Sequence, residues 1–272
     1  MTTRDPQLAA REVAHSTWVD RGARAGLVAK GIAYLIIALI AIQVAVSGDG
    51  RPQGPDGALE SVADEPFGWA LLALLAIGFT GYAVWRVVQA IFDREREGRD
   101  PIGLGKRLGY LVDGLFHLGL GALAVAVLAG AGTSSNGEQR ATAEVLDKPF
   151  GRWLVGAVGV GIVVGGLGLA IWACTARFRK HLRTGMMRQA ESRGYTVLGV
   201  FGHLSRAVVI VLVGVFVVRA AWQYDPDEAA GLDGALQTLA GQPYGPYLLG
   251  TVAFGLLAYA LFCFVEARYR DV

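Results

Sequence analysis

The sequence has few charged residues and few cysteines, and both shortages limit what the protein can be. Asp, Glu, Lys and Arg supply only 18% of its 272 residues, whereas 53% of the residues are hydrophobic. Soluble domains carry about 25% charged residues, so this chain is too apolar for an ordinary soluble fold. The two cysteines, Cys174 and Cys263, have no CxxC spacing. We expect them to stay reduced and to serve as small residues in helix packing.

Common catalytic and cofactor motifs are also missing. The sequence contains no P-loop, no GxGxxG motif and no HExxH zinc motif. A haem held by two histidines could use only His117 and His203, which we expect on different helices at different depths. We therefore predict no metal, no cofactor and no catalytic residue, and a protein that is not an enzyme.

Long apolar runs fill most of the chain instead. A helix needs about 20 apolar residues to cross the hydrocarbon core, and barrel strands are much shorter and alternate in polarity. The sequence therefore predicts an all-α, polytopic membrane protein with six transmembrane helices in a lipid bilayer. The first run is too long for the apolar part of a cleaved signal peptide, which is the alternative there. The six runs cover residues 26–46, 67–92, 108–131, 153–175, 196–222 and 246–265.

Lysines and arginines gather on one side of these runs. The two terminal tails and the loops at 93–107 and 176–195 hold 17 of them, and the three opposite loops hold four. The positive-inside rule then places both termini in the cytoplasm, in a bacterial plasma membrane. Because orientation already explains the basic loops, we predict no nucleic-acid binding.

A three-residue motif of proline, an aromatic residue and glycine occurs three times. Each copy precedes an aromatic residue and a long apolar run, and the copies lie 83 and 94 residues apart. Such periodicity indicates repeated structural units. The copies are Pro66-Phe67-Gly68, Pro149-Phe150-Gly151 and Pro243-Tyr244-Gly245.

Each repeat contains two crossings, so each returns the chain to its original side. The three repeats are therefore parallel and related by rotation about the membrane normal. We predict three two-helix repeats around a pseudo-threefold axis. The expected boundaries are a tail at 1–25, repeats at 26–92, 108–175 and 196–265, loops at 93–107 and 176–195, and a tail at 266–272.

The segment before each triplet predicts a short amphipathic helix on the outer surface. Asp56 and Asp233 each lie ten residues before their proline, and aspartate is a favourable helix N-cap. Aromatic residues near these segments are expected to form an interfacial belt; an extracellular recognition surface is the alternative. The belt residues are Trp69, Trp153, Trp222, Tyr224 and Tyr247.

Polar residues inside the apolar runs are the strongest indication of a functional site. Aligning the starts of the odd-numbered helices places Lys30, Asp113 and His203 at equivalent positions, and one turn further lie Tyr34, His117 and Arg206. A charge near the centre of a membrane helix costs about 2.5–3.5 kcal/mol, so such groups usually face the bundle interior. We predict that these six residues line the bundle axis.

Anchoring is the alternative interpretation of the same residues. Lys30 and Arg206 lie about one turn from the cytoplasmic side, and a long basic side chain can extend to the headgroups. The same interpretation applies to Arg86 in the second helix. A static clamp between Lys30 and Asp113 is the other structural explanation.

Two further motifs carry a resemblance to a known family. They are Gly81-Tyr82-Ala83-Val84-Trp85-Arg86 and the final Val265-Glu266-Ala267-Arg268-Tyr269-Arg270. Together with the triplets, they resemble a bacterial, mainly actinobacterial, integral membrane family called domain of unknown function 1206. The resemblance implies three two-helix repeats and no particular activity. The second repeat departs from the pattern, because Ala173 follows Trp172 where Arg86 follows Trp85.

Two functions therefore remain open. The first is a channel or transporter for a small solute or ion, with the polar cluster near the bundle axis. The second is a non-catalytic scaffold or assembly subunit that binds lipid, a partner membrane complex or a second copy of itself.

Overall fold

The computed structural model describes residues 17–95, 97–131, 137–176, 178 and 189–269. Most of the expected N-terminal tail, much of the basic loop at 176–195 and the last three residues lie outside this part of the chain. The described residues form helices and no strand, which confirms the all-α prediction. The long helices are α2 (Thr17–Ser47), α4 (Gly68–Phe92), α5 (Pro101–Leu128), α7 (Gly151–Cys174), α8 (Gln189–Gln223) and α10 (Gly245–Tyr269).

All six long helices have the length and apolar composition needed to cross a membrane. Three of them begin well before the apolar runs that predict them, and α2 does so at Thr17 rather than near residue 26. α5 begins at Pro101, because a proline fits the first helical position and Asp100 before it is extended. α8 begins at Gln189 rather than near residue 196. The apolar runs thus mark the part of each helix that suits the bilayer, and the helices continue into polar sequence.

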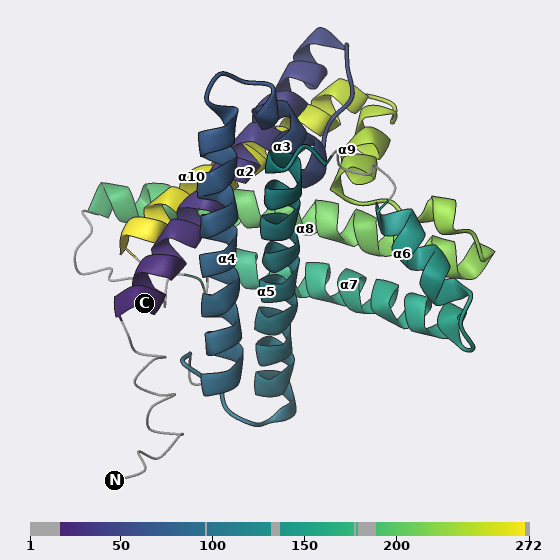
Figure 1. Cartoon of the computed structure of the whole chain (residues 1–272), viewed down its shortest axis with the longest axis horizontal. Coiled ribbons are helices and arrows are strands. Elements are labelled where there is room, and N and C mark those ends of the chain that lie inside the picture. Colours follow the sequence, from purple (N-terminus) through teal and green to yellow (C-terminus); the bar gives the residue numbers. More distant parts are fainter. Residues whose placement is uncertain (1–16, 96, 132–136, 177, 179–188, 270–272) are drawn as a thin grey trace.

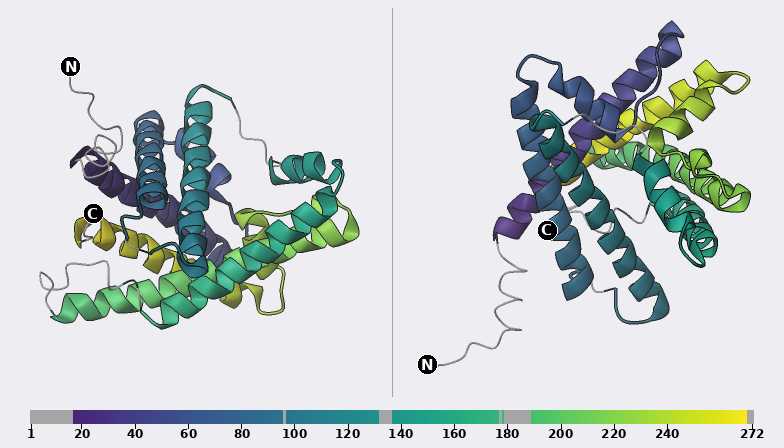
Figure 2. Two further views of the ribbon diagram at one scale, coloured as in Figure 1. Left: turned by 90° about the horizontal axis from the view of Figure 1, so that it is seen from below. Right: turned by 45° about the vertical axis from the view of Figure 1, so that its right-hand side comes forward.

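Three pairs of long helices run side by side (Figures 1 and 2). They are α4 with α5, α7 with α8, and α2 with α10. In Figure 1, α7 and α8 run across α4 and α5, and α2 and α10 pass obliquely between these pairs. α2 also packs on α4, and α10 packs on α8.

The two long helices of the second repeat differ from those of the other repeats. α2 and α4 pack together, as do α8 and α10, but the described residues of α5 and α7 form no extensive contact. The extensive helix contacts therefore follow the order α5, α4, α2, α10, α8, α7, and no extensive contact joins the described residues of the two end helices. The pseudo-threefold arrangement stays a prediction.

Close approach of glycine to tyrosine positions the helices in the first and third repeats. A Cβ atom at Gly26 of α2 would lie 2.3 Å from the Cβ atom of Tyr82 on α4. A Cβ atom at Gly202 of α8 would lie 2.7 Å from the Tyr259 backbone on α10. Small residues permit such backbone contact between membrane helices. The two interfaces therefore correspond at this glycine–tyrosine contact.

Each Pro-aromatic-Gly triplet forms the same turn into a long helix. The three central residues, Phe67, Phe150 and Tyr244, all have left-handed backbone conformations, with φ of 65°, 64° and 63°. A Cβ atom on the glycine that follows each of them would lie 1.8–1.9 Å from a carbonyl oxygen of the preceding segment. Glycine is therefore required there. These glycines are Gly68, Gly151 and Gly245.

Short helices precede these turns, as the sequence predicts: α3 (Pro55–Ala63), α6 (Gly137–Leu146) and α9 (Leu232–Ala240), with a 3₁₀ turn, η3 (Pro226–Glu228), before α9. The prediction that Asp56 and Asp233 are N-caps is wrong. Gly54 and Gly231 occupy the N-cap positions, and the aspartates lie in the first turns. There an acidic side chain stabilises the positive end of the helix dipole without capping it.

Candidate functional site

Asp113 on α5 is the centre of a group of charged and polar side chains. We call this group the Asp113 cluster; it consists of Lys30, Tyr82, Arg86, Asp113, His117 and Arg206. Its members come from α2, α4, α5 and α8, so it joins helices from all three repeats. Lys30 and His117 have side chains only 2% exposed, and Asp113 is 18% exposed.

One oxygen of the Asp113 carboxylate is held by direct hydrogen bonds. Oδ2 accepts from Arg86 Nε at 2.7 Å and from the Tyr82 hydroxyl at 2.8 Å. The Tyr82 oxygen also accepts from Lys30 Nζ at 3.0 Å and from Arg86 Nε at 2.9 Å. Tyr82 thus connects both cations to the carboxylate. Hydrogen bonds to charged groups are stronger than those between neutral groups.

The other carboxylate oxygen has a different environment. Oδ1 lies 3.7 Å from Lys30 Nζ, 3.6 Å from Arg206 Nη2 and 3.6 Å from His117 Nδ1. These separations suit ion pairs but are too long for good hydrogen bonds. His117 Nδ1 instead donates to the backbone carbonyl oxygen of Asp113 at 2.7 Å.

Tyrosines surround the cationic side of the cluster. Arg206 Nη1 donates to the Tyr259 hydroxyl at 3.1 Å. The rings of Tyr34 and Tyr259 pack edge to face, 4.8 Å apart. The Arg206 guanidinium lies 5.8 Å from the Tyr34 ring centre and 5.2 Å from that of Tyr259, within reach of cation–π attraction.

A chain of polar side chains leads from the cluster to the loop between α4 and α5. Arg86 Nη1 donates to Gln89 Oε1 at 3.0 Å, and Gln89 Nε2 donates to Glu95 Oε1 at 2.6 Å. Glu95 follows the end of α4. Asp113 is therefore connected to the loop through Arg86, Gln89 and Glu95.

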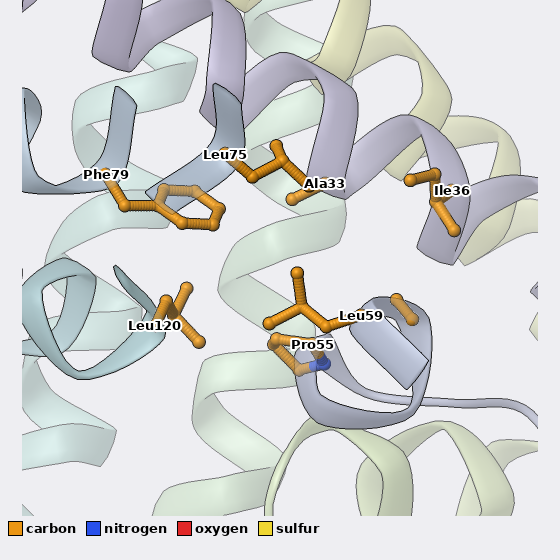
Figure 3. Close-up of a pocket in the computed structure, with 8 residues that line it drawn as sticks. Ala33, Ile36, Pro55, Leu59, Leu75, Phe79 and Leu120 are labelled. Carbon is orange, nitrogen blue, oxygen red and sulfur yellow. The ribbon is translucent and has the colours of Figure 1, made fainter. Parts of the chain in front are cut away.

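On the side of the cluster away from the α4–α5 loop, the neighbouring side chains are apolar. The His117 ring packs on Phe79, 5.9 Å between ring centres. Beyond Phe79 is a cavity of about 10 Å³ under the short helix α3, with Leu59, Leu75 and Leu120 around it (Figure 3). A second cavity, of about 540 Å³, lies along α2 and the loop that follows it. Neither cavity is lined by the Asp113 cluster.

The structure brings together four of the six residues predicted to line the axis: Lys30, Asp113, His117 and Arg206. Tyr34 lies beside them, against Arg206 and Tyr259. The His203 ring packs among Phe178, Trp172, Tyr259 and Phe262. Its Nδ1 donates to the carbonyl oxygen of Gly199 at 2.7 Å.

The predicted equivalence of His203 with Lys30 is wrong. Gly26 and Gly202 make the corresponding helix contacts, and Lys30 and Arg206 each follow their glycine by four residues. Arg206 therefore takes the position of Lys30 in the third repeat. The sequence alignment missed this because it matched glycines at the helix starts, where the third copy of the motif differs.

Anchoring at the headgroups does not describe Lys30 or Arg86 in this structure. The Nζ atom of Lys30 is directed to Tyr82 inside the bundle, and Arg86 is paired with Asp113. Tyr82 and Tyr259 were not among the residues predicted to line the axis. A signal for both was present, because each follows the proline of its repeat by 16 residues and is followed by alanine.

Cationic side chains outnumber carboxylates around Asp113. Among the described residues, Lys30, Arg86 and Arg206 lie within 4 Å of this one carboxylate. Glu266 on α10 is near enough to interact electrostatically with Arg86. Even with Glu266 included, three cations face two carboxylates.

The fold and the cluster define a class: a multi-pass membrane protein made of three two-helix repeats with a buried ionic centre. The chain belongs to the family described as Domain of Unknown Function (DUF1206), whose model matches residues 25–93, 108–176 and 201–270. Counted from these starts, Lys30, Asp113 and Arg206 occupy the same position in each repeat.

A relative from Bacillus subtilis (strain 168), "Uncharacterized protein YxxB", is 32% identical over 255 residues. The match covers 94% of this chain and 92% of the relative. No solved structure matches the chain. The expectation of an actinobacterial origin stays a prediction.

Proposed function

We propose that the protein moves a small solute or ion across the membrane by way of the Asp113 cluster. The observation that carries the proposal is the position of Asp113, which is partly buried and lies between Lys30, Arg86 and Arg206 from three other helices. Ionisable groups inside a bilayer are costly, and they commonly mark ion or substrate pathways. A clamp between two helices needs one ion pair, whereas this cluster has four charged members.

The polar chain through Gln89 and Glu95 supports access to the cluster from the α4–α5 loop. The apolar packing of Phe79, Leu75 and Leu59 supports closure on the side of the short helices. The arrangement suits a binding site that is accessible from one side at a time, as transport requires. By the positive-inside rule, the accessible side is the cytoplasm of a bacterial cell, and both termini lie there.

Flux into liposomes that contain the purified protein tests this proposal. Wild type is compared with Asp113→Asn and with Asp100→Asn, which removes an exposed carboxylate at the start of the same helix. Flux above that of empty liposomes, changed by Asp113→Asn and retained by Asp100→Asn, supports the proposal. Absence of flux for a range of ions and pH gradients, with folded wild type, contradicts it.

A scaffold that binds lipid is the second candidate, and the larger cavity favours it. The cavity of about 540 Å³ combines apolar residues of α2, such as Leu39 and Ile40, with polar loop residues such as Asp49 and Arg51. A lipid tail and headgroup have the same distribution of polarity. This function is favoured over transport if the purified protein shows no flux but retains a defined lipid, and if Arg51→Gln loses that lipid.

A further inference from the structure

We propose that the Asp113 cluster binds a small inorganic anion, such as chloride or nitrate, between Lys30 and Arg206. This inference rests on the proposed function, whose substrate class it names. It also stands as a binding site if the protein moves nothing. Lys30 and Arg206 occupy equivalent positions in the first and third repeats, and both face Oδ1 of Asp113.

Unused hydrogen-bond donors are the first observation. Lys30 Nζ has three donors in a side chain that is 2% exposed. Within the described part of the chain, its direct hydrogen bond goes to Tyr82. Arg206 has five donors, of which one reaches the Tyr259 hydroxyl and another is directed to the Tyr34 hydroxyl. Its Nε atom is buried and has no partner among the described residues.

The spacing around Asp113 Oδ1 is the second observation. Lys30 Nζ and Arg206 Nη2 stand 3.7 and 3.6 Å from this oxygen, so neither forms a good direct hydrogen bond with it. Both cations are close to Asp113 while keeping donors free. A ligand that accepts hydrogen bonds from both would use those donors.

Charge decides which ligand fits. The cations Lys30, Arg86 and Arg206 exceed the nearby carboxylates, and removing an unpaired charge from water is expensive. A metal cation would increase the excess, and a water molecule would leave it unchanged. An anion offsets it.

Anion-dependent stability tests the proposal directly. The purified protein in detergent is placed in sodium gluconate, and chloride or nitrate replaces gluconate at constant ionic strength. We expect a saturable rise of Tm, because a ligand that binds the folded state stabilises it. In Lys30→Gln and Arg206→Gln, the half-saturating concentration rises at least about tenfold, since a hydrogen bond to a charged group contributes about 1.5–3 kcal/mol.

Arg219→Gln is the matched control, because Arg219 lies on the same helix as Arg206 but pairs with Glu228 and is half exposed. It keeps the wild-type response. The proposal is overturned if folded wild type shows no saturable response to chloride or nitrate. It is equally overturned if Lys30→Gln or Arg206→Gln, whichever folds, responds as wild type does.

The outcome for the anion site is separable from the outcome for transport. Saturable anion binding without flux in liposomes leaves the anion site and removes the transport function. Flux of cations, with no anion response in detergent, leaves transport and removes the anion site.

Discussion

Arg86 Nε and Asp113 Oδ2 are 2.7 Å apart, and this contact joins α4 to α5 across the boundary between the first and second repeats. Arg86 has no counterpart in the other repeats, where Ala173 or Cys263 follows the corresponding Trp or Phe. The cluster therefore combines a position shared by all three repeats with a cation contributed by one of them. The excess of positive charge follows from this asymmetry.

Because cations outnumber carboxylates around Asp113, removing the carboxylate should lower stability by a different amount than removing a cation. Asp113→Asn leaves Lys30, Arg86 and Arg206 without their central counter-charge, and loss of one member of a buried ion pair costs about 3–5 kcal/mol. Arg206→Gln loses a hydrogen bond to Tyr259, but it also reduces repulsion with Lys30. We expect Asp113→Asn to lower the free energy of unfolding clearly more than Arg206→Gln, measured by unfolding in detergent with gluconate as the anion.

Asp100→Asn controls for the loss of a carboxylate from α5 and should leave stability within about 0.5 kcal/mol of wild type, as exposed substitutions usually do. Equal losses for Asp113→Asn and Arg206→Gln would show that the cluster is electrically balanced, contrary to the excess of cations described above.

The Tyr82 hydroxyl predicts a second effect on stability. Tyr82→Phe removes the hydroxyl that donates to Asp113 and accepts from Lys30 and Arg86. A buried group left without its partner costs about 1–3 kcal/mol. Tyr259→Phe removes a hydrogen bond to Arg206 and should cost less. Tyr247→Phe, at a residue 77% exposed, should have no effect. The same unfolding assay compares the three variants, and a Tyr82→Phe protein as stable as wild type would contradict the importance of this hydroxyl.

The sequence predicts the helices much better than it predicts how they meet. Apolar length identifies all six long helices because the bilayer imposes it on each separately. The three triplets predict the turns because the same backbone conformation needs glycine each time. Contacts between helices depend on rotation and tilt, which apolar length does not determine. For this reason the sequence did not indicate the separation of α5 from α7.

The Asp113 cluster could be predicted in part for a related reason. A charge in an apolar run is visible in the sequence, so Lys30, Asp113 and Arg206 stood out. Which of these residues occupy equivalent positions in the repeats depends on which glycine packs against Tyr82 or Tyr259. Because the sequence contains many glycines, it did not indicate the correct one. Arg86 was interpreted as a surface anchor because its partner lies 27 residues away on another helix.

The triplet turns predict a requirement for glycine but not for the aromatic residue before it. In Gly68→Ala, the new Cβ atom would lie 1.9 Å from the Val62 carbonyl oxygen, so the turn must move and we expect a loss of several kcal/mol. Phe67→Gly relieves a left-handed conformation that costs about 1–2 kcal/mol for a residue with a Cβ atom. Phe67 is 79% exposed, so little packing within the chain is lost.

Thermal unfolding and expression level in membranes compare Gly68→Ala, Phe67→Gly and wild type. We expect a severe loss for Gly68→Ala and unchanged or higher stability for Phe67→Gly. A tolerated Gly68→Ala would mean that the segment from Val62 to Gly68 has another conformation in the membrane.

The pseudo-threefold arrangement predicts a contact between α5 and α7 that can be tested by cross-linking. In the first repeat, the Cβ atom of Ala29 lies 2.4 Å from the Cβ position of Gly78. In the third, that of Ser205 lies 2.3 Å from the Cβ position of Gly255. The corresponding residues of the second repeat are Val112, just before Asp113, and Gly161, 12 residues after its proline.

A Cβ atom at Gly161 would meet nothing within 4 Å in this structure. We predict that the second repeat closes in the membrane as the other two do, because Gly161 supplies a glycine at the position that Gly78 and Gly255 occupy in the other repeats. Val112→Cys with Gly161→Cys, in a protein with Cys174→Ser and Cys263→Ala, should then form a disulfide within one chain on mild oxidation. Val112→Cys with Gly168→Cys, about two turns away on α7, is the control and should not. If the first pair does not cross-link within a chain, in membranes that contain folded protein, the pseudo-threefold arrangement is rejected and α5 and α7 stay apart. Cross-linked dimers would instead assign this face to a second copy of the chain.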